Sequence, residues 1–348
     1  MRNRAVIWSA LLAVGLAAFG CKGKDGGGNS KTEPAARPPE PAEPAVPAFD
    51  GLAAARAWTA VATAKDTAAL PGLYAENASV IPASSGMTLT GPARIAQFFS
   101  QFWTAMPDLT YEPYLALASG HRVATVGRTR GTNSNGLMGA PATNKQTSFL
   151  GLSIAEYDEA GAIQTQTLYA DNLSFMGQLG IWDGPHRAYD TSAAPAPRQA
   201  AAADSDAERA NVALVENALS AFNAHDAVAL AALYAPDAVL ADQSAADDAT
   251  GDAIAAAYKG LFASFPDAQK TEHVVWGAGD WVVSTYRLTG TNQGPLERLG
   301  LSEGSGKAID LQVGDVIRVA DGAIAEHWIF ADGMAVGIQL GALQLPGM

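Results

Sequence analysis

The hydrophobic and polar positions in the second half of the chain begin with the period of a helix. Within residues 207–223 the apolar side chains recur at intervals of three or four, which predicts an amphipathic helix. A shorter helix is expected around 228–234, and a third over 252–264, which Pro266 ends. The N-terminal part of this half is therefore predicted to be helical.

After a short strand that begins at Val239, the pattern changes to runs typical of strands, with turn signals at 277–280 and at Asp321-Gly322. These strand-like runs lie at 271–277, 281–290, 307–319 and 323–330. Helices followed by hairpin-linked strands indicate an α+β arrangement, in which the helices pack on one face of a curved sheet. We expect a pocket between that face and the helices.

The same order of signals occurs in the first half of the chain, with a helix over 95–103 and a last turn at 158–161. The segment 322–341 matches 161–180 at identical spacing, so that Asp332 corresponds to Asp171. The matched pairs further upstream are Tyr234 with Tyr74, Gly251 with Gly91, Pro266 with Pro107, and Gly290 with Gly131. Because the order is kept over so long a span, the sequence predicts two copies of one domain.

Low-complexity stretches set the boundaries of these domains. A Gly-rich and then Pro-rich segment precedes the first copy, and an Ala/Pro-rich segment separates the two copies. The expected segments are a signal peptide at 1–21, a disordered tether at 22–48, domain 1 at 49–185, a linker at 186–205 and domain 2 at 206–345.

The only cysteine, Cys21, closes an apolar run that follows Arg2 and Arg4. This run is shorter than the about 20 residues of a membrane span, and it indicates a secretory signal. A signal that ends at cysteine resembles a bacterial lipoprotein signal, which implies a lipid on Cys21 and a position at the cell envelope, facing the periplasm. An ordinary cleaved signal with an incidental cysteine is the alternative.

The net charge of −13 is concentrated in the second copy. Residues 51–185 hold 7 Lys/Arg and 9 Asp/Glu, whereas residues 206–345 hold 7 and 19. Such a negative surface repels phosphate backbones, so we expect no nucleic-acid partner. The five scattered histidines and the single cysteine give no metal-ligand spacing, so no metal and no cofactor are expected.

Two motifs carry a more specific resemblance. One is the Gly131-Thr-Asn133 segment with the glycines, proline and threonine that follow it up to Lys145. The other runs from Asp315 through Glu326-His327-Trp328 and Asp332 to Gln339-Leu-Gly341. Both resemble the SnoaL-like polyketide cyclases, whose cone-shaped fold is shared with nuclear transport factor two, ketosteroid isomerase and scytalone dehydratase.

The resemblance implies two tandem cone-shaped α+β barrel domains, each with N-terminal helices packed on a curved, mostly antiparallel sheet that encloses a pocket. The first copy departs from the family pattern with Thr167 in place of an aromatic residue. The second copy keeps Glu-His-Trp but loses the Pro-x-Thr-Gly hairpin. If only one copy acts on a ligand, the second is favoured.

Asp332 occupies the position that the resemblance assigns to the family's acid/base aspartate. On a strand, Trp328, Phe330 and Asp332 share one face, with Glu326 behind them. Apolar neighbours would raise the pKa of the carboxyl group toward values that suit a general acid or base. The alternative is that Asp332 caps the short helix expected at 334–340.

Asp171 stands before residues 173–179 in the same way and is the weaker candidate, because it has fewer aromatic neighbours. His327 has the opposite strand parity to Trp328, so we expect it to face away from the pocket. The aromatic residues expected to wall the pockets are Trp276, Trp281, Tyr286 and Tyr258 in the second copy and Trp103, Phe99, Tyr111 and Phe102 in the first.

Three functions fit these observations. The first is proton-transfer chemistry in the second pocket, such as cyclisation, isomerisation or dehydration of a small apolar molecule. The second is a lipoprotein that binds a small apolar or aromatic ligand without catalysis. The third is a structural module in which the two copies pair within the chain or the chain forms a homodimer.

Overall fold

The computed structural model describes residues 49–83, 85–137 and 141–343. The predicted signal peptide and tether, including Cys21, lie outside these residues. The described chain forms two tandem α+β domains, each with helices packed on a mixed sheet. We call residues 49–185 the first repeat and residues 206–345 the second repeat.

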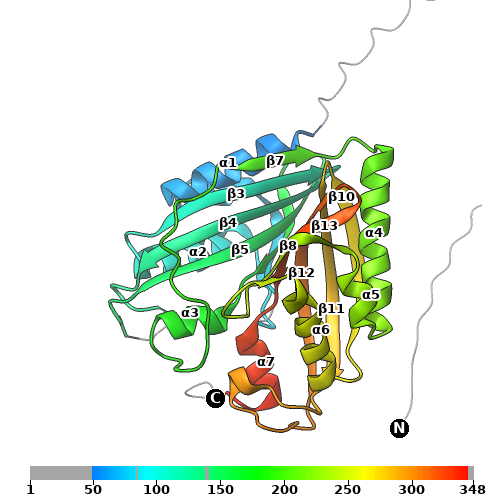
Figure 1. Cartoon of the computed structure of the whole chain (residues 1–348). Helices are drawn as coiled ribbons and strands as arrows, with labels where there is room; N and C mark the ends of the chain where they lie inside the picture. The colour runs from blue at the N-terminus through cyan, green and yellow to red at the C-terminus, as the bar shows by residue number, and fades with distance from the viewer. Residues whose placement is uncertain (1–48, 84, 138–140, 344–348) are drawn as a thin grey trace, which may run out of the picture. The chain divides into compact units, whose positions relative to one another are not determined.

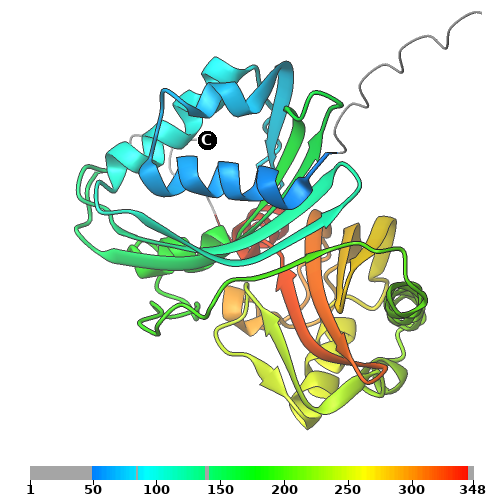
Figure 2. The same ribbon diagram turned by 90° about the horizontal axis from the view of Figure 1, so that it is seen from above.

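The first repeat begins with helix α1 and ends with helix α3, and helix α2 follows its first two strands (Figure 1). Its elements are α1 (Gly51–Ala64), the 3-10 turn η1 (Leu70–Leu73), β1 (Tyr74–Pro82), β2 (Leu89–Thr90), α2 (Pro92–Ala105), β3 (Thr110–Ser119), β4 (Arg122–Thr132), β5 (Gln146–Tyr157), β6 (Ile163–Tyr169) and α3 (Asn172–Gln178). The strands lie in the order β2-β1-β6-β5-β4-β3. Helices α1 and α2 lie on the same side of the curved strands β3 to β5 (Figure 2).

The second repeat has the same order of strands and long helices, with helix α5 in place of η1 and an additional 3-10 turn, η2. Its elements are α4 (Asp206–Asn223), α5 (Ala227–Ala231), β8 (Tyr234–Asp242), β9 (Ala249–Thr250), α6 (Asp252–Ser264), β10 (Gln269–Ala278), β11 (Trp281–Thr291), the 3-10 turn η2 (Glu297–Leu299), β12 (Ala308–Ala320), β13 (Ala323–Phe330) and α7 (Gly333–Leu340). The strand order β10-β11-β12-β13-β8-β9 is that of the first sheet. The predicted order of helices and strands is therefore confirmed.

Local chemistry explains where several elements begin and turn. Ser205 and Glu208 form a capping box at the start of α4, in which each side chain bonds the backbone N–H of the other residue. Asp321 and Gly322 connect β12 to β13 with φ angles of 50° and 76°. Two successive positive φ angles suit a tight hairpin, which explains the Asp-Gly pair.

The segment expected to be only a linker contributes a strand. β7 (Arg198–Ala201) pairs parallel to β3 at the edge of the first sheet. Upstream of it, Asp190 and Ser192 bind the buried guanidinium of Arg128. Parallel pairing and a buried ion pair hold this segment in place, and neither could be recognised from an Ala/Pro-rich composition.

Each repeat buries its own core between helices and sheet, and one further cluster of apolar side chains draws on both sheets. From the first sheet it takes Leu115, Leu117, Val126 and Leu152, and from the second Trp281, Val283, Val316 and Phe330. Both faces of each sheet are consequently buried over part of their area. Among the helices that the structure describes, none is long and apolar enough to cross a membrane.

Candidate ligand-binding cavity

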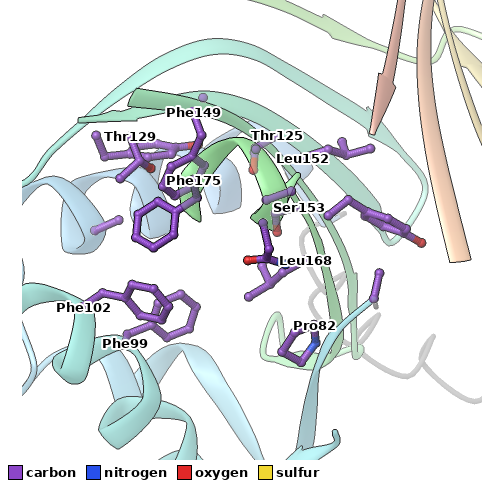
Figure 3. Close-up of a pocket in the computed structure, with 18 of the residues that line it drawn as sticks. Pro82, Phe99, Phe102, Thr125, Thr129, Phe149, Leu152, Ser153, Leu168 and Phe175 are labelled. Atoms are coloured by element: carbon purple, nitrogen blue, oxygen red, sulfur yellow. The ribbon is translucent and has the colours of Figure 1, made fainter. Parts of the chain in front are cut away.

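A cavity of about 220 Å³ lies in the first repeat, between its helices and the sheet. Aromatic side chains form most of its wall. In Figure 3, Phe99 and Phe102 of α2 lie on one side, and Phe149 and Phe175 lie on the other. The other aromatic residues in the wall are Trp58, Phe98, Trp103, Tyr111 and Tyr169. The expectation that Phe99, Phe102, Trp103 and Tyr111 wall a pocket is thus confirmed.

Three positions around this cavity carry small residues in the first repeat. Ala62 on α1, Gly127 on β4 and Gly151 on β5 all line it, and the two glycines pair across their strands. The glycine pair corresponds to Tyr286 and Val313, which pair across β11 and β12. Ala62 corresponds to Phe222, since both lie three residues before the left-handed residue that follows the helix.

The exchange of small for large residues accounts for the difference between the two interiors. In the second repeat, the cavity bounded by Phe222 and Tyr258 measures only about 20 Å³. In the first repeat, the ring of Tyr111 lies directly over Gly127, and a Cβ atom there would be only 2.3 Å from it. Any residue other than glycine at this position would clash with the ring. A Cβ atom on Gly151 would meet nothing closer than 3.7 Å.

Asp171 is the carboxylate in the cavity wall. It caps α3, where its oxygens accept hydrogen bonds from the backbone N–H groups of Leu173 and Ser174 at 3.3 and 2.8 Å. A third bond, of 2.7 Å, comes from the N–H of Gly333 in the second repeat. Burial raises the pKa of Asp171, against the lowering effect of Ser174 and Gly333.

Asp332 caps α7 in the corresponding way, with a 3.0 Å bond from the N–H of Met334. It also accepts two hydrogen bonds from Asn172, of 3.1 Å from the backbone and 2.7 Å from the side chain. Burial, followed by the nearby charge of Asp171, raises the pKa of Asp332 to about 6. The capping alternative therefore describes its contacts, and its role in acid/base chemistry stays a prediction.

The interior of the second repeat is occupied by a buried ionic network. Lys270 lies 3.3 Å from Asp315, and Tyr286 donates to the same carboxylate at 3.1 Å. His327 lies 3.2 Å from Asp315 and 2.6 Å from the hydroxyl of Tyr234. Burial alone would raise the pKa of Asp315, but Lys270 and His327 outweigh it and hold this pKa below its ordinary value.

The expectation that His327 faces away from the interior is wrong, because only 4% of it is exposed. Its neighbour Trp328 lies on the opposite face of β13, where it packs 5.5 Å from Trp281 in the cluster shared by the two sheets. Phe330 and Trp276 belong to the same cluster. These three candidate ligand contacts thus lie on the face of the sheet opposite the helices.

Glu326 is also engaged within the protein. Its carboxylate accepts two bonds from Arg198, at 3.0 and 3.1 Å, and one from Arg318 at 2.7 Å. The guanidinium of Arg198 in turn lies 4.5 Å from the ring of Trp281. A ligand would have to displace Arg198 to reach Glu326.

Tyr286 and Tyr258, by contrast, point into the interior of the second repeat. Tyr286 bonds Asp315, and the hydroxyl of Tyr258 lies 2.7 Å from that of Tyr234. Burial raises the pKa of Tyr258 and that of Tyr286 above their ordinary value. Sequence reasoning favoured the second repeat as the ligand site, whereas the structure has the larger cavity in the first. The missed signal was the alignment of Ala62 with Phe222 and of Gly151 with Val313 in the two repeats.

Comparison with known proteins identifies the family. The model of the SnoaL-like polyketide cyclases matches residues 52–179 and again residues 213–340. Similar solved structures include AclR, a proposed hydroxylase from Streptomyces galilaeus, with 21% identity over 39% of this chain and 99% of that one, at a TM-score of 0.36. A proposed polyketide cyclase from Xanthomonas campestris pv. campestris has 24% identity with the same coverage and TM-score.

IdmH, a proposed polyketide cyclase from Streptomyces antibioticus, has 23% identity over 38% of this chain and 99% of that one, at a TM-score of 0.33. No curated protein matches the chain. The two family matches coincide with the two repeats found in the sequence, and together they cover most of the chain. The chain therefore belongs to the SnoaL-like polyketide cyclase family and carries two copies of its domain.

Proposed function

We propose that the first repeat binds a small, flat and mostly apolar molecule in the cavity between α1, α2 and the sheet. The observation that supports this is the 220 Å³ cavity with its aromatic wall. A buried apolar cavity of about 150 Å³ is enough to hold benzene. The cavity of the first repeat therefore has room for a substituted ring. The second repeat, with about 20 Å³, would hold a water molecule at most.

The substitution Gly151→Val tests this proposal, because it places the valine of the second repeat at the matching position of the first. Thermal shift and calorimetric titration with single-ring aromatic compounds should show binding to the wild type and its loss in Gly151→Val. Gly260→Val is the matched control, since Gly260 is exposed on α6 and has open space around it. Equal binding to the wild type, Gly151→Val and Gly260→Val would show that the ligand does not bind in this cavity. If the cavity binds these compounds, mass spectrometry of molecules that co-purify with the wild type would identify the natural ligand.

Proton-transfer chemistry at Asp171 is the second candidate function. It is supported by the position of Asp171 in the cavity wall and by burial, which raises the pKa of its carboxyl group. Such a group can take a proton from carbon beside a carbonyl and return it to oxygen. Asp171→Asn keeps most of the capping ability, because asparagine caps helices nearly as well as aspartate. Catalysis predicts lost turnover with retained ligand binding, whereas a pure cap predicts that neither changes.

We also propose that the two repeats pair through their sheets within one chain. The apolar cluster that includes Val126 and Val283, and the contacts of Arg198 with Glu326, support this proposal. Small-angle scattering of the purified protein should fit one compact particle in the range 49–343. Independently tumbling repeats would contradict it.

Finally, we propose that a lipid on Cys21 holds the protein at the bacterial cell envelope, facing the periplasm. The support is the position of the only cysteine at the end of the apolar run. Cys21→Ser should move the protein from the membrane fraction to the soluble envelope fraction. Tight membrane association of that variant would rule out the anchor.

A further inference from the structure

A chain of buried hydrogen bonds leads from α1 to the cavity of the first repeat. The indole N–H of Trp58 lies 3.4 Å from the hydroxyl of Tyr74, which lies 2.5 Å from Oε1 of Gln166. The side-chain nitrogen of Gln166 lies 2.7 Å from Oγ of Ser153. All four side chains are buried, and Ser153 lines the cavity. The chain of bonds thus ends at the cavity wall, where Figure 3 shows Ser153 beside Leu168.

The direction of these bonds follows from the donor and acceptor groups. An indole nitrogen can only donate, so Tyr74 accepts from Trp58. The hydroxyl hydrogen of Tyr74 then needs an acceptor, and Oε1 of Gln166 is the one within reach. This orients the amide of Gln166 so that its nitrogen donates to Ser153. The hydroxyl hydrogen of Ser153 is left to point elsewhere, and none of the described residues accepts it.

The second repeat has a corresponding row of buried side chains, in which the hydroxyl of Tyr234 hydrogen-bonds His327, and Nε2 of His327 lies 3.2 Å from the carboxylate of Asp315. Tyr234, His327 and Asp315 occupy the positions of Tyr74, Gln166 and Ser153, since Ser153 and Asp315 lie at matching places in the strand register. There the chain ends on a carboxylate that Lys270 and Tyr286 satisfy from the opposite side.

The ring of Tyr286 stands in the second repeat at the position of Gly127, where in the first repeat the ring of Tyr111 crosses the strand. The hydroxyl of Tyr286 hydrogen-bonds the residue at the position of Ser153. The second repeat thus shows that the residue at the position of Ser153 can bind a polar atom at the edge of a flat ring. The polarity is reversed, because Asp315 accepts a hydrogen bond whereas Ser153 has one to donate.

We infer that Ser153 is a specificity-determining residue that donates a hydrogen bond to the ligand, and that the ligand is a flat ring bearing an acceptor oxygen such as a carbonyl. This inference rests on the proposed binding function of the first repeat. It adds that Trp58, Tyr74 and Gln166 position the hydroxyl of Ser153. The cavity therefore favours a ring that carries an acceptor oxygen at its edge over a ring without one.

Two nearly isosteric probes test the inference. Acetophenone and α-methylstyrene are both flat and differ in a C=O group against a C=CH₂ group. The ratio of their dissociation constants, measured by calorimetric titration or by NMR on the full-length protein, isolates the hydrogen bond from the hydrophobic contribution. Ser153→Ala should raise the dissociation constant of acetophenone relative to that of α-methylstyrene by about fivefold, which is the effect of losing one ordinary hydrogen bond. Ser153→Thr retains the hydroxyl and should restore the wild-type ratio.

Ser148→Ala is the matched control, because Ser148 is a buried serine of the same strand that does not line the cavity. It should leave the ratio unchanged. If the wild type binds neither probe, the proposed binding function fails. If both probes bind and Ser153→Ala leaves their ratio as in the wild type, the binding function stands and the role of Ser153 is refuted. A Ser148→Ala effect as large as that of Ser153→Ala would also refute it.

Discussion

Asp171 and Asp332 exchange hydrogen bonds between the two repeats. Each carboxylate caps its own helix and also accepts the N–H of the first residue of the other helix. The bond from Gly333 to Asp171 measures 2.7 Å, and the bond from Asn172 to Asp332 measures 3.1 Å. The two family aspartates are therefore parts of one arrangement, although 161 positions separate them in the sequence.

The exchange has an electrostatic consequence, because both carboxylates are buried. Burial is the main cause that raises the pKa of Asp332 to about 6, and the negative charge of Asp171 adds to it. A carboxyl group whose pKa is higher in the folded than in the unfolded chain binds its proton preferentially in the folded state. Protonation of Asp332 therefore stabilises the fold.

The first prediction is that the wild type gains stability relative to Asp332→Asn as the pH falls from 7 to 3. A pKa raised to about 6 corresponds to a gain of about 3 kcal/mol in the free energy of unfolding. This gain is fully present below the ordinary pKa of aspartate and is lost as the pH rises through 6. Asparagine does not titrate, so the difference between the two proteins reports the titration of Asp332 together with its effect on the neighbouring Asp171. Urea denaturation at several pH values measures it.

Asp237→Asn serves as the control for that experiment, since Asp237 is exposed on β8. Its pH profile should follow that of the wild type. Parallel profiles for the wild type and Asp332→Asn would show that Asp332 does not titrate in this range, and would leave it with the capping role alone.

The second prediction concerns the ion pair of Lys270 and Asp315, both of which are buried. Lys270→Met leaves the carboxylate of Asp315 without its cation in the interior, which should lower the free energy of unfolding by about 3–5 kcal/mol. The double variant Lys270→Met with Asp315→Leu removes both charges and should recover most of that loss. Denaturant titration of the three proteins checks this, and a double variant as unstable as the single one would contradict it.

The third prediction concerns Arg198 of β7, which binds Glu326 and lies against the ring of Trp281. Arg198→Ala should lower the free energy of unfolding by about 1–2 kcal/mol, because a cation–π contact and a half-exposed ion pair are lost together. Arg198→Lys keeps the charge but not the planar fork, so it should recover only part of this loss. Full recovery in Arg198→Lys would show that charge alone matters at this position. Thermal unfolding measures both variants.

The order of helices and strands followed from the sequence because hydrophobic period and turn chemistry are local. Residues 252–264, for instance, were predicted as a helix and form α6 with the same bounds. The hairpin at Asp321-Gly322 was likewise recognisable from two residues. The pairing of β7 with β3 depends instead on contacts between distant residues, and the composition of the linker carries no trace of it.

The face of a strand is harder to assign than its existence. Strand parity correctly placed Trp328 and Phe330 on the same face of β13. Strand parity does not show which face of β13 meets the helices, because both faces of this sheet are buried. One face is covered by helices and the other by the apolar cluster shared with the first sheet. For the same reason the side chain of His327 was assigned to the wrong side.

The location of the cavity depends on the size of side chains rather than on their polarity. The Glu-His-Trp motif favours the second repeat, yet the interior of that repeat is filled by Phe222 and Tyr286. The informative comparison was between equivalent positions of the two repeats, where a glycine or an alanine stands opposite an aromatic ring. Such a comparison needs the strand register, which the sequence alone leaves uncertain by a residue or two.

The last prediction exchanges these residues in both directions. Phe222→Ala opens a cavity in the packed interior of the second repeat and removes the ring that lies 4.7 Å from Nζ of Lys270, so it should lower the free energy of unfolding by about 3–5 kcal/mol. Ala62→Phe makes the opposite change in the first repeat, where the added ring enters a cavity that already exists. It should leave stability nearly unchanged and abolish the binding of single-ring aromatic ligands, and denaturant titration with calorimetry measures both effects. Equal destabilisation by the two variants would mean that the first repeat is as closely packed around Ala62 as the second is around Phe222, and the cavity could then not serve as a ligand site.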